Sequence, residues 1–304
     1  MKKKRVEITD RTLVELFNIY GDALKQKASL VRELTELIYI FGADYIEITP
    51  DLYDILCPLP KGIEFRINVK KEMKLLSSNR LEKEILKNYN TDDNKNLRIV
   101  GLDDLILYDY EEKFSFIKSL LGENVEMLIG DEYGCSTALA LEWIKCGGKN
   151  IITSFTGIGK LTPLEQLFCS LEFLDKKSLR GNQTILPQII ELFEEITNVE
   201  VEENKPFIGK KIFDVESGVH VDGIIKNPKN FEPYEPSKIG KQRKIIIGKF
   251  SGTKSIEFKL QELNVPYSMD KIELILDEVR SKSMKERRGL KDSELLDICE
   301  KVGA

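Results

Sequence analysis

Apolar and β-branched residues gather in six short runs within the first 155 residues, and longer stretches of helical period separate these runs. The runs predict strands at 5–8, 45–48, 64–69, 97–101, 125–129 and 150–154. Alternation of strands and helices is typical of right-handed βαβ units. The pattern therefore predicts a parallel sheet covered by helices.

Between the predicted strands, apolar residues recur every three or four positions. In the clearest case Leu24, Ala28, Val31, Leu34 and Ile38 share one helical face. Gly42 follows them and predicts the end of that helix. Further helices are predicted around 73–85, 114–121, 138–144 before Gly147-Gly148, and 164–171 after Pro163.

The number of predicted strands bears on the fold class. A complete (β/α)8 barrel typically takes ~250 residues, whereas six strands are seen here in roughly 155. We therefore expect an α/β fold with a TIM-barrel-derived (β/α) domain that lacks some βα units. The alternative is that weak strands escape the pattern, for example within 75–96.

The alternation stops after about residue 175. A helix is predicted at 185–196, and the stretch 205–252 is rich in Gly, Pro and Lys, which is typical of an extended arm with turns. Helical patterns return at 253–263, 270–281 and 291–302. This predicts a barrel-like domain at 1–180, a helix plus linker arm at 181–252, and a small helical C-terminal subdomain at 253–304.

The composition of the chain excludes several classes of function. The formal net charge of −5 offers no positive field for nucleic acid or an anionic membrane, and no apolar run approaches the ~18 residues of a membrane span. Five cysteines stand singly without a CxxC pair, and no signal-peptide pattern is present, which together predict a cytoplasmic protein. The only histidine is His220, so any site that needs two imidazoles from this chain is excluded.

The predicted arm carries the most specific motif of the chain. Residues 216–223 read E-S-G-V-H-V-D-G, residues 231–240 read F-E-P-Y-E-P-S-K-I-G, and residues 248–252 read G-K-F-S-G. These segments resemble, in order and spacing, the arm of the homocitrate synthase and 2-isopropylmalate synthase family, whose members are metalloenzymes related to HMG-CoA lyase. The resemblance implies a TIM-barrel domain followed by this arm.

Four segments of the N-terminal part also resemble that family. Residues 8–13 look like its opening strand, 43–50 like its second strand, 130–134 like its H-N-D-x-G segment and 152–159 like its eighth strand. The likeness covers about residues 5–263. The next recognisable segment after 43–50 is 102–104, Leu-Asp-Asp, and the distance between the two along the chain is too short for the family. The units near strands four and five are therefore expected to be absent.

In the family, an Asp and two His hold a divalent metal that activates a 2-oxo acid for condensation with acetyl-CoA, and a neighbouring Arg assists. At those positions this chain has Val14 for the Arg, Glu15 for the Asp, and Leu128 and Gly130 for the histidines. Val, Leu and Gly can neither ligate a metal nor stabilise an oxyanion. The sequence therefore predicts a non-catalytic binding, structural or regulatory relative, without a cofactor.

In two alternative interpretations, this chain retains the acyltransferase activity of the family. Asp10, Glu15, Glu47, Asp131 and Glu132 fall at or near the C-terminal ends of predicted strands, where barrel sites form. A carboxylate cluster of Glu15, Asp131 and Glu132 would suit Mg²⁺ or Mn²⁺, with Glu47 as a catalytic group. Otherwise a partner chain supplies the absent histidines and strands.

His220 and Ser154 complete the candidate site. His220 resembles the arm histidine that reaches the partner subunit's active site, where it could act as a general acid or base; it could equally hold the arm by hydrogen bonds. Ser154 takes the place of a substrate-binding Thr. Phe231 and Phe250 replace the arm's Tyr and second His, which weakens a proton relay. The resemblance implies a homodimer through the arm, and an intact synthase subunit is a second predicted partner.

Overall fold

The computed structural model describes residues 6–67, 71–75, 77–88 and 97–303. Residue 5 of the first predicted strand, residues 68 and 69 of the third, and residues 76 and 89–96 of the possible weak-strand region lie outside the described residues. The chain divides into two compact units, one ending at Ile208 and the other beginning at Gly209. Each unit is described by itself.

The first unit consists of alternating strands and helices, with two helices at its end. Its elements are β1 (Glu7–Asp10), α1 (Thr12–Tyr20), α2 (Ala28–Phe41), β2 (Tyr45–Glu47), α3 (Pro50–Leu56), β3 (Phe65–Arg66), β4 (Lys71–Lys74), α4 (Leu81–Asn88), β5 (Leu97–Gly101), α5 (Tyr110–Leu121), β6 (Glu126–Ile129), α6 (Ser136–Lys145), β7 (Asn150–Thr153), α7 (Leu164–Cys169) and α8 (Leu186–Thr197).

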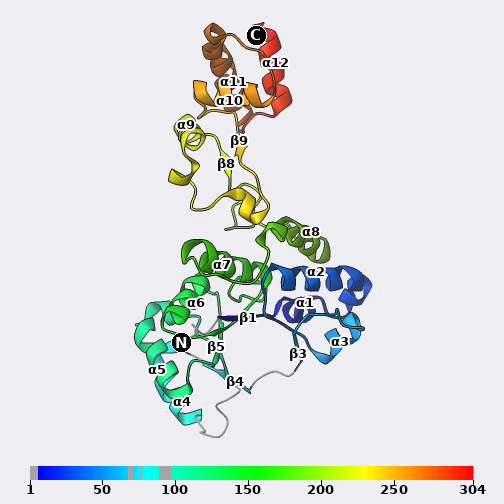
Figure 1. Cartoon of the computed structure of the whole chain (residues 1–304), viewed down its shortest axis with the longest axis vertical. Helices are drawn as coiled ribbons and strands as arrows, with labels where there is room; N and C mark the ends of the chain where they lie inside the picture. The colour runs from blue at the N-terminus through cyan, green and yellow to red at the C-terminus, as the bar shows by residue number, and fades with distance from the viewer. Residues whose placement is uncertain (1–5, 68–70, 76, 89–96, 304) are drawn as a thin grey trace. The chain divides into compact units, whose positions relative to one another are not determined.

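The seven strands that the described residues of this unit contain form one all-parallel sheet in the order β3-β2-β1-β7-β6-β5-β4. The first strand pairs with the last, with Ile8 opposite Ile151, as in a closed (β/α) barrel. The described parts of β3 and β4 are the two edges, so the ring of strands is open between them. The helices lie around the strands (Figure 1). The fold is thus TIM-barrel-like and incomplete, which confirms the predicted fold class.

Each of the six predicted strands contains an observed strand, but the pattern missed β4. The sequence of β4 is Lys-Glu-Met-Lys, and only Met73 is buried, because the strand lies at an open edge. The strand also precedes the range 75–96 in which a weak strand was considered. A single buried residue gives no alternating pattern to recognise.

The predicted helix before Gly42 is confirmed as α2. Val31, Leu34 and Ile38 are fully buried along it, and Gly42 follows its last residue with φ of 145°. Leu24 lies in the preceding 3₁₀ turn rather than in the helix itself. Helix α8 packs against α2 within the first unit, whereas the sequence division placed this helix with the arm.

The second unit consists of a two-stranded parallel ladder and four α-helices. These are β8 (Asp214–Val215), α9 (Gly218–Lys226), β9 (Lys244–Ile245), α10 (Thr253–Glu262), α11 (Ile272–Glu286) and α12 (Asp292–Val302). The prediction of an extended arm was wrong at 218–226, which is helical. Val221 and Ile224 are buried on one face of α9, and this packing outweighs the low helix propensity of Gly and Val.

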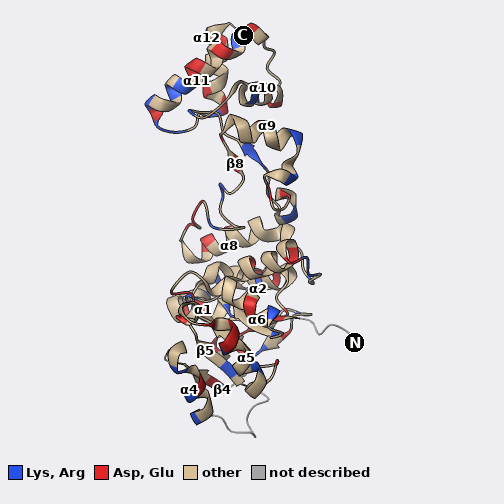
Figure 2. Ribbon diagram, turned by 90° about the vertical axis from the view of Figure 1, so that its left-hand side faces the viewer, with Lys and Arg blue, Asp and Glu red and all other residues tan. Residues whose placement is uncertain are grey.

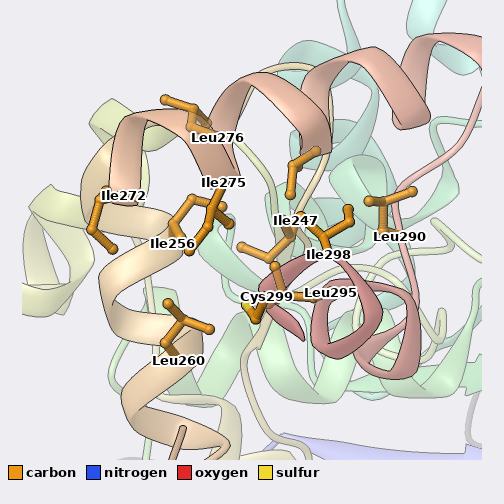
Figure 3. Packing of buried hydrophobic residues seen from close by; sticks show 11 residues of the cluster. Ile247, Ile256, Leu260, Ile272, Ile275, Leu276, Leu290, Leu295, Ile298 and Cys299 are labelled. Atoms are coloured by element: carbon orange, nitrogen blue, oxygen red, sulfur yellow. The ribbon is translucent and has the colours of Figure 1, made fainter. Parts of the chain in front are cut away.

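The core of the second unit lies between α10, α11 and α12. Ile256 and Leu260 of α10 pack with Ile275 of α11 and Ile298 of α12 (Figure 3). Ile247 and Leu290, which form a bridge between their backbones, contribute to the same cluster. The unit thus has a hydrophobic core of its own.

The surface offers both signs of charge. Lys and Arg are interspersed with Asp and Glu along the elements of both units (Figure 2), as the formal net charge of −5 leads us to expect. No helix among the described residues is both long enough and apolar enough to cross a membrane.

Candidate functional site

The concave side of the sheet is crossed by buried ion pairs. Arg98 on β5 lies 2.5 Å (Nη2 to Oε2) from Glu47 on β2, and its Nε donates to Oε2 of Glu126 on β6 at 3.0 Å. Three strands separate β2 from β5 in the sheet order. These side chains therefore meet only because the sheet curls into a partial barrel and encloses them.

Two further arginines extend this cluster. Arg66 on β3 pairs with Glu126 and donates to Oγ1 of Thr9 at 2.9 Å. Arg11, which follows β1, lies 2.6 Å from Glu47 and 2.7 Å from Glu15. We call this set the interior network; its members are Arg11, Glu15, Glu47, Arg66, Arg98 and Glu126.

The centre of the interior network is nearly closed to solvent, whereas Arg11, Glu15 and Arg66 are partly exposed. Arg98 is 1% exposed, Glu126 is fully buried and Glu47 is 3% exposed. Burial opposes the charge of Arg98, but the hydrogen bonds and charges of Glu47 and Glu126 outweigh it and raise its pKa. Buried carboxylates that are matched to arginines in this way are held as ion pairs. Their oxygens already have charged partners within the protein.

The residues at the family's catalytic positions mostly pack in the core. Val14 and Leu16 on α1 are buried. Leu128 forms an apolar cluster with Ile152 and Leu161. Glu15, at the position of the metal-binding Asp, is engaged by Arg11 and by Nδ2 of Asn18 at 3.2 Å. The side chains at these positions are thus apolar, apart from the carboxylate of Glu15, which Arg11 neutralises.

The second histidine position, Gly130, has no room for a side chain. A Cβ at Gly130 would lie 1.4 Å from Oδ1 of Asp103, so the carboxylate of Asp103 occupies that space. Burial, followed by the charge of Glu132, raises the pKa of Asp103. An acidic group has therefore taken the place that an imidazole fills in the family.

The donor set does not fit the divalent ion that the family implies. Neither histidine is present at its position, and Glu15 is held by Arg11. Within residues 6–67, 71–75, 77–88 and 97–303, no three His, Cys, Asp or Glu side chains gather closely enough to hold a metal ion. Glu15, Asp131 and Glu132 accordingly do not form one cluster.

Asp131 and Glu132 have separate partners in the loop after β6. Oδ1 of Asp131 accepts from the backbone N of Ser136 at 2.9 Å at the start of α6. Glu132 lies 2.8 Å from Nζ of Lys160 at the surface. Beside them is an open cavity of about 460 Å³, lined by Leu75, Leu102, Asp103, Asp104, Glu132 and Tyr133. These residues follow β4, β5 and β6, so the cavity lies at the C-terminal edge of the sheet.

Ser154 is buried and supports the loop that follows β7. Its Oγ donates to the carbonyl of Ile158 at 2.7 Å, and its backbone pairs with Thr162 and Leu164. In the loop, Thr156, Gly157, Gly159 and Lys160 all have positive φ. The hydroxyl predicted to bind substrate thus fixes a tight turn.

Two buried carboxyl groups lie outside the interior network. Burial raises the pKa of both Asp10 and Glu165 to about 7. Asp10 accepts from the backbone N and the hydroxyl of Thr12, at 3.0 and 2.9 Å. Glu165 accepts from the backbone N of Thr156 at 3.0 Å, and its other oxygen has no partner among the described residues.

His220 lies on α9 of the second unit, where it is exposed and makes an edge contact with Phe231, 5.7 Å between ring centroids. The glycines of the motifs around His220 have a packing role. Gly218 lies against the backbone of Gly252, and Oε1 of Glu216 accepts from the backbone N of Phe250 at 2.9 Å. Residues of the motifs at 216–223 and 248–252 therefore hold the start of α9 against the segment that leads into α10.

Sequence reasoning missed the three arginines and Asp103. Arg66 and Arg98 lie within the predicted third and fourth strands, where a charge in an otherwise apolar run was the available signal. A charge in a strand that is buried on both faces requires a partner, which points inward. Asp103 stood in a recognised segment, but its contact with Gly130 depends on the fold.

Comparison with known proteins shows which proteins this chain resembles. The family model described as "Homocitrate synthase post-HMGL domain-like" matches residues 207–287. The omega subunit of homocitrate synthase from Clostridium pasteurianum is 33% identical over 202 residues, 66% of this chain and 57% of that protein. Homocitrate synthase AksA from Methanothermobacter thermautotrophicus is 35% identical over 153 residues, 49% of this chain and 39% of that protein.

A third relative is the probable 2-isopropylmalate synthase of Ignicoccus hospitalis, 33% identical over 184 residues, 60% of this chain and 46% of that protein. The carboxyl transferase domain of Rhizobium etli pyruvate carboxylase has a TM-score of 0.29 at 12% identity, over 90% of this chain and 60% of that chain, too low to add to the fold. This chain spans about half the length of the curated relatives it matches.

The first unit has an open, all-parallel TIM-barrel-like sheet, and the second unit follows it along the chain. This arrangement defines the class of protein. The matches cover parts of both units. The chain is similar to members of the homocitrate synthase and 2-isopropylmalate synthase family, in a shortened and divergent form.

Proposed function

We propose that this chain is an accessory subunit of a homocitrate synthase-type assembly, with a binding, structural or regulatory role and no condensation activity of its own. The interior network carries this proposal. Arginines neutralise the carboxylates of the barrel interior, and Asp103 fills the place of a metal-binding side chain. The similarity to a protein named as an omega subunit supports the role of a subunit.

An activity assay of the isolated chain tests this proposal. The chain is incubated with acetyl-CoA, 2-oxoglutarate and Mg²⁺ or Mn²⁺, and free coenzyme A is measured. We expect no release above that of a Glu15→Ala variant. Turnover by the wild-type chain that this substitution abolishes would contradict the proposal.

A second candidate function is condensation completed by a partner chain. The chain spans about half the length of its relatives, and one of these is itself named as a subunit. In this candidate a synthase chain from the same organism supplies the histidines. The test is coenzyme A release by the mixture: activity above the sum of the separate chains supports completion, and a sum without gain opposes it.

The version of this candidate that uses a carboxylate metal site depends on Glu15, Asp131 and Glu132, with Glu47 as the catalytic group. Calorimetric titration with Mn²⁺ separates it from the others. Binding that Glu132→Gln removes would favour a remodelled site, whereas equal heats from both proteins would exclude these residues as ligands.

A further inference from the structure

The loop between β7 and α7 is hydrogen-bonded to a buried carboxyl group. Oε2 of Glu165, near the start of α7, accepts from the backbone N of Thr156 at 3.0 Å. Glu165 is fully buried, and its Oε1 has no hydrogen-bond partner among the described residues. A buried carboxylate oxygen without a donor has lost its water and gained nothing in return, whereas a protonated carboxyl carries no charge. The closed loop therefore favours the protonated form of Glu165.

Three further titratable groups face Glu165. Asp10, at the end of β1, is also fully buried, and the two carboxyl groups repel each other when they are ionised. Cys169 of α7 is buried too, and burial, followed by the charge of Glu165, raises the pKa of its thiol. Lys205 favours the ionised form of Glu165, but its charge is outweighed by burial, which raises the pKa of Glu165 to about 7.

The backbone of the loop is strained. Thr156 has φ of 59° and ψ of 0°, and Lys160 also has φ of 59°. A β-branched residue rarely adopts this left-handed conformation, and it persists only where the surroundings hold it. Here Glu165 accepts from the N–H of Thr156, and Nζ of Lys205 donates to the carbonyl of Thr156 at 2.6 Å. Weakening of these two hydrogen bonds would let the loop relax.

The loop lies over charged groups at the C-terminal edge of the sheet. Gly159 is next to the carboxylate of Glu15, since a Cβ at Gly159 would lie 2.6 Å from Oε2 of Glu15. Nζ of Lys160 lies 2.8 Å from Glu132, which lines the cavity of about 460 Å³. Movement of the loop would therefore expose Glu15 and separate Lys160 from Glu132.

We propose that residues 155–160 form a pH-sensitive lid, which stays closed while Glu165 is protonated and opens more readily as Glu165 ionises. Opening hydrates the carboxylate of Glu165, and the proton passes to solvent. It also releases Thr156 from its left-handed conformation and uncovers Glu15. The lid operates in the chain alone, whatever partner the chain has.

The direction of the pH dependence follows from the two states of Glu165. Its pKa is about 7 in the closed lid and returns to the ordinary 4.5 in the open lid. Below about pH 4.5 both states hold the proton, and above about pH 8 both have lost it. Between these limits opening releases a proton, so the opening equilibrium constant rises with pH, by about 40-fold from pH 5 to pH 7.

Hydrogen exchange of the full chain from pH 5 to pH 8, corrected for the intrinsic exchange rate at each pH, tests the lid. We expect peptides that span residues 155–160 to show this 40-fold rise and to level off near pH 8. Low concentrations of urea should leave their exchange unchanged but speed that of β5 and β6, because global unfolding exposes far more surface. A pH-independent opening constant, or one equal to that of β5 with the same urea dependence, would refute the lid.

The variants Glu165→Gln and Glu191→Gln form a matched pair, since each neutralises one carboxylate and Glu191 is exposed. We expect Glu165→Gln to open at least tenfold less than the wild type at pH 7, without pH dependence, and Glu191→Gln to follow the wild type. Lys205→Met should raise opening at every pH, because it removes the hydrogen bond to Thr156. A pH dependence that survives Glu165→Gln but is lost in Asp10→Asn would refute the role of Glu165. If Glu165→Gln does not fold, the pH series of the wild type decides.

Discussion

Arg98 joins the two halves of the curled sheet through Glu47 on β2 and Glu126 on β6. All three side chains are almost completely buried. Such a cluster is held together by mutual neutralisation, since each charge has lost its water. Removal of the arginine alone would leave two carboxylates in the interior with fewer donors, which destabilises the folded state.

We expect Arg98→Met to lower the free energy of unfolding of the first unit by about 3–5 kcal/mol, the usual cost of breaking a buried pair. Urea unfolding followed by the fluorescence of Trp143, the single tryptophan and fully buried in this unit, measures the change. Lys145→Met, which removes an exposed pair with Glu142, is the control and should cost less than about 1 kcal/mol. Equal losses of unfolding free energy in the two variants would mean that the interior network contributes little to stability.

Glu165 makes the stability of the first unit depend on pH. Burial raises its pKa from the ordinary 4.5 to about 7 in the folded protein. The folded state therefore retains a proton that the unfolded chain releases. The resulting stabilisation is complete below about pH 4.5, declines as the pH rises, and is lost above about pH 7.

The variant Glu165→Gln should remove this dependence. Relative to the wild type, its free energy of unfolding should rise by about 3 kcal/mol between pH 4.5 and pH 8, since Gln does not ionise. Unfolding by urea at several pH values measures the difference, with the exposed Glu191→Gln as control. A constant difference across this range would show that Glu165 titrates normally.

At the scale of residues, the sequence shows which residue types stand at the family's positions but not which side chains contact one another. The single histidine and the replacements at Val14, Leu128 and Gly130 can be read from the chain. The contact between Asp103 and Gly130 cannot, because it joins two loops that only the sheet brings together. Arginine partners across the barrel are equally hidden, since the curl of the sheet determines them.

At the scale of elements, apolar periodicity located the strands that are buried on both faces. It failed at β4, an edge strand with one buried residue, and at α9, whose glycines and valines favour no helix in isolation. In α9, Val221 and Ile224 are buried, and Gly218 closely approaches the backbone of Gly252. Local sequence does not encode that approach, which is a tertiary contact.

The approach of Gly218 to Gly252 can be tested from both sides. A Cβ at Gly218 would lie 2.7 Å from the backbone N of Gly252, whereas a Cβ at Gly252 would lie 3.4 Å from Cα of Gly218. We expect Gly218→Ala to destabilise the second unit by about 1–3 kcal/mol and Gly252→Ala by less than about 1 kcal/mol. Hydrogen exchange of peptides from α9 and α10 measures both, and similar losses would exclude close packing as the reason for the glycine.

At the scale of the whole molecule, the short connection after β3 contains no helical crossover, and β3 and β4 are the two edges of the sheet. A sheet that is open at one seam retains the parallel order of a barrel but not its closure. The sequence indicated missing units from the spacing of its motifs. It could not show that the opening lies between two parallel edges, because β4 was not recognised.

Self-association is the remaining property at this scale, and we expect it to involve the surface around α9. Val219 is 77% exposed and Phe250 is 64% exposed, and Ile225 and Phe231 nearby are also exposed. The backbones of Gly218 and Phe250 are hydrogen-bonded, and Phe231 lies against Gly223, so these side chains belong to one region. Exposed apolar groups that gather in this way typically mark a protein interface.

We therefore expect the full chain to sediment as a homodimer at micromolar concentration and the double variant Val219→Lys/Phe250→Lys as a monomer. Lysines placed in an apolar interface would have to lose water without a partner, which opposes association. Leu274→Lys, at a side chain 57% exposed on α11, is the matched control and should remain dimeric. A monomeric wild-type chain would contradict the homodimer, and a dimeric double variant would place its interface on another surface.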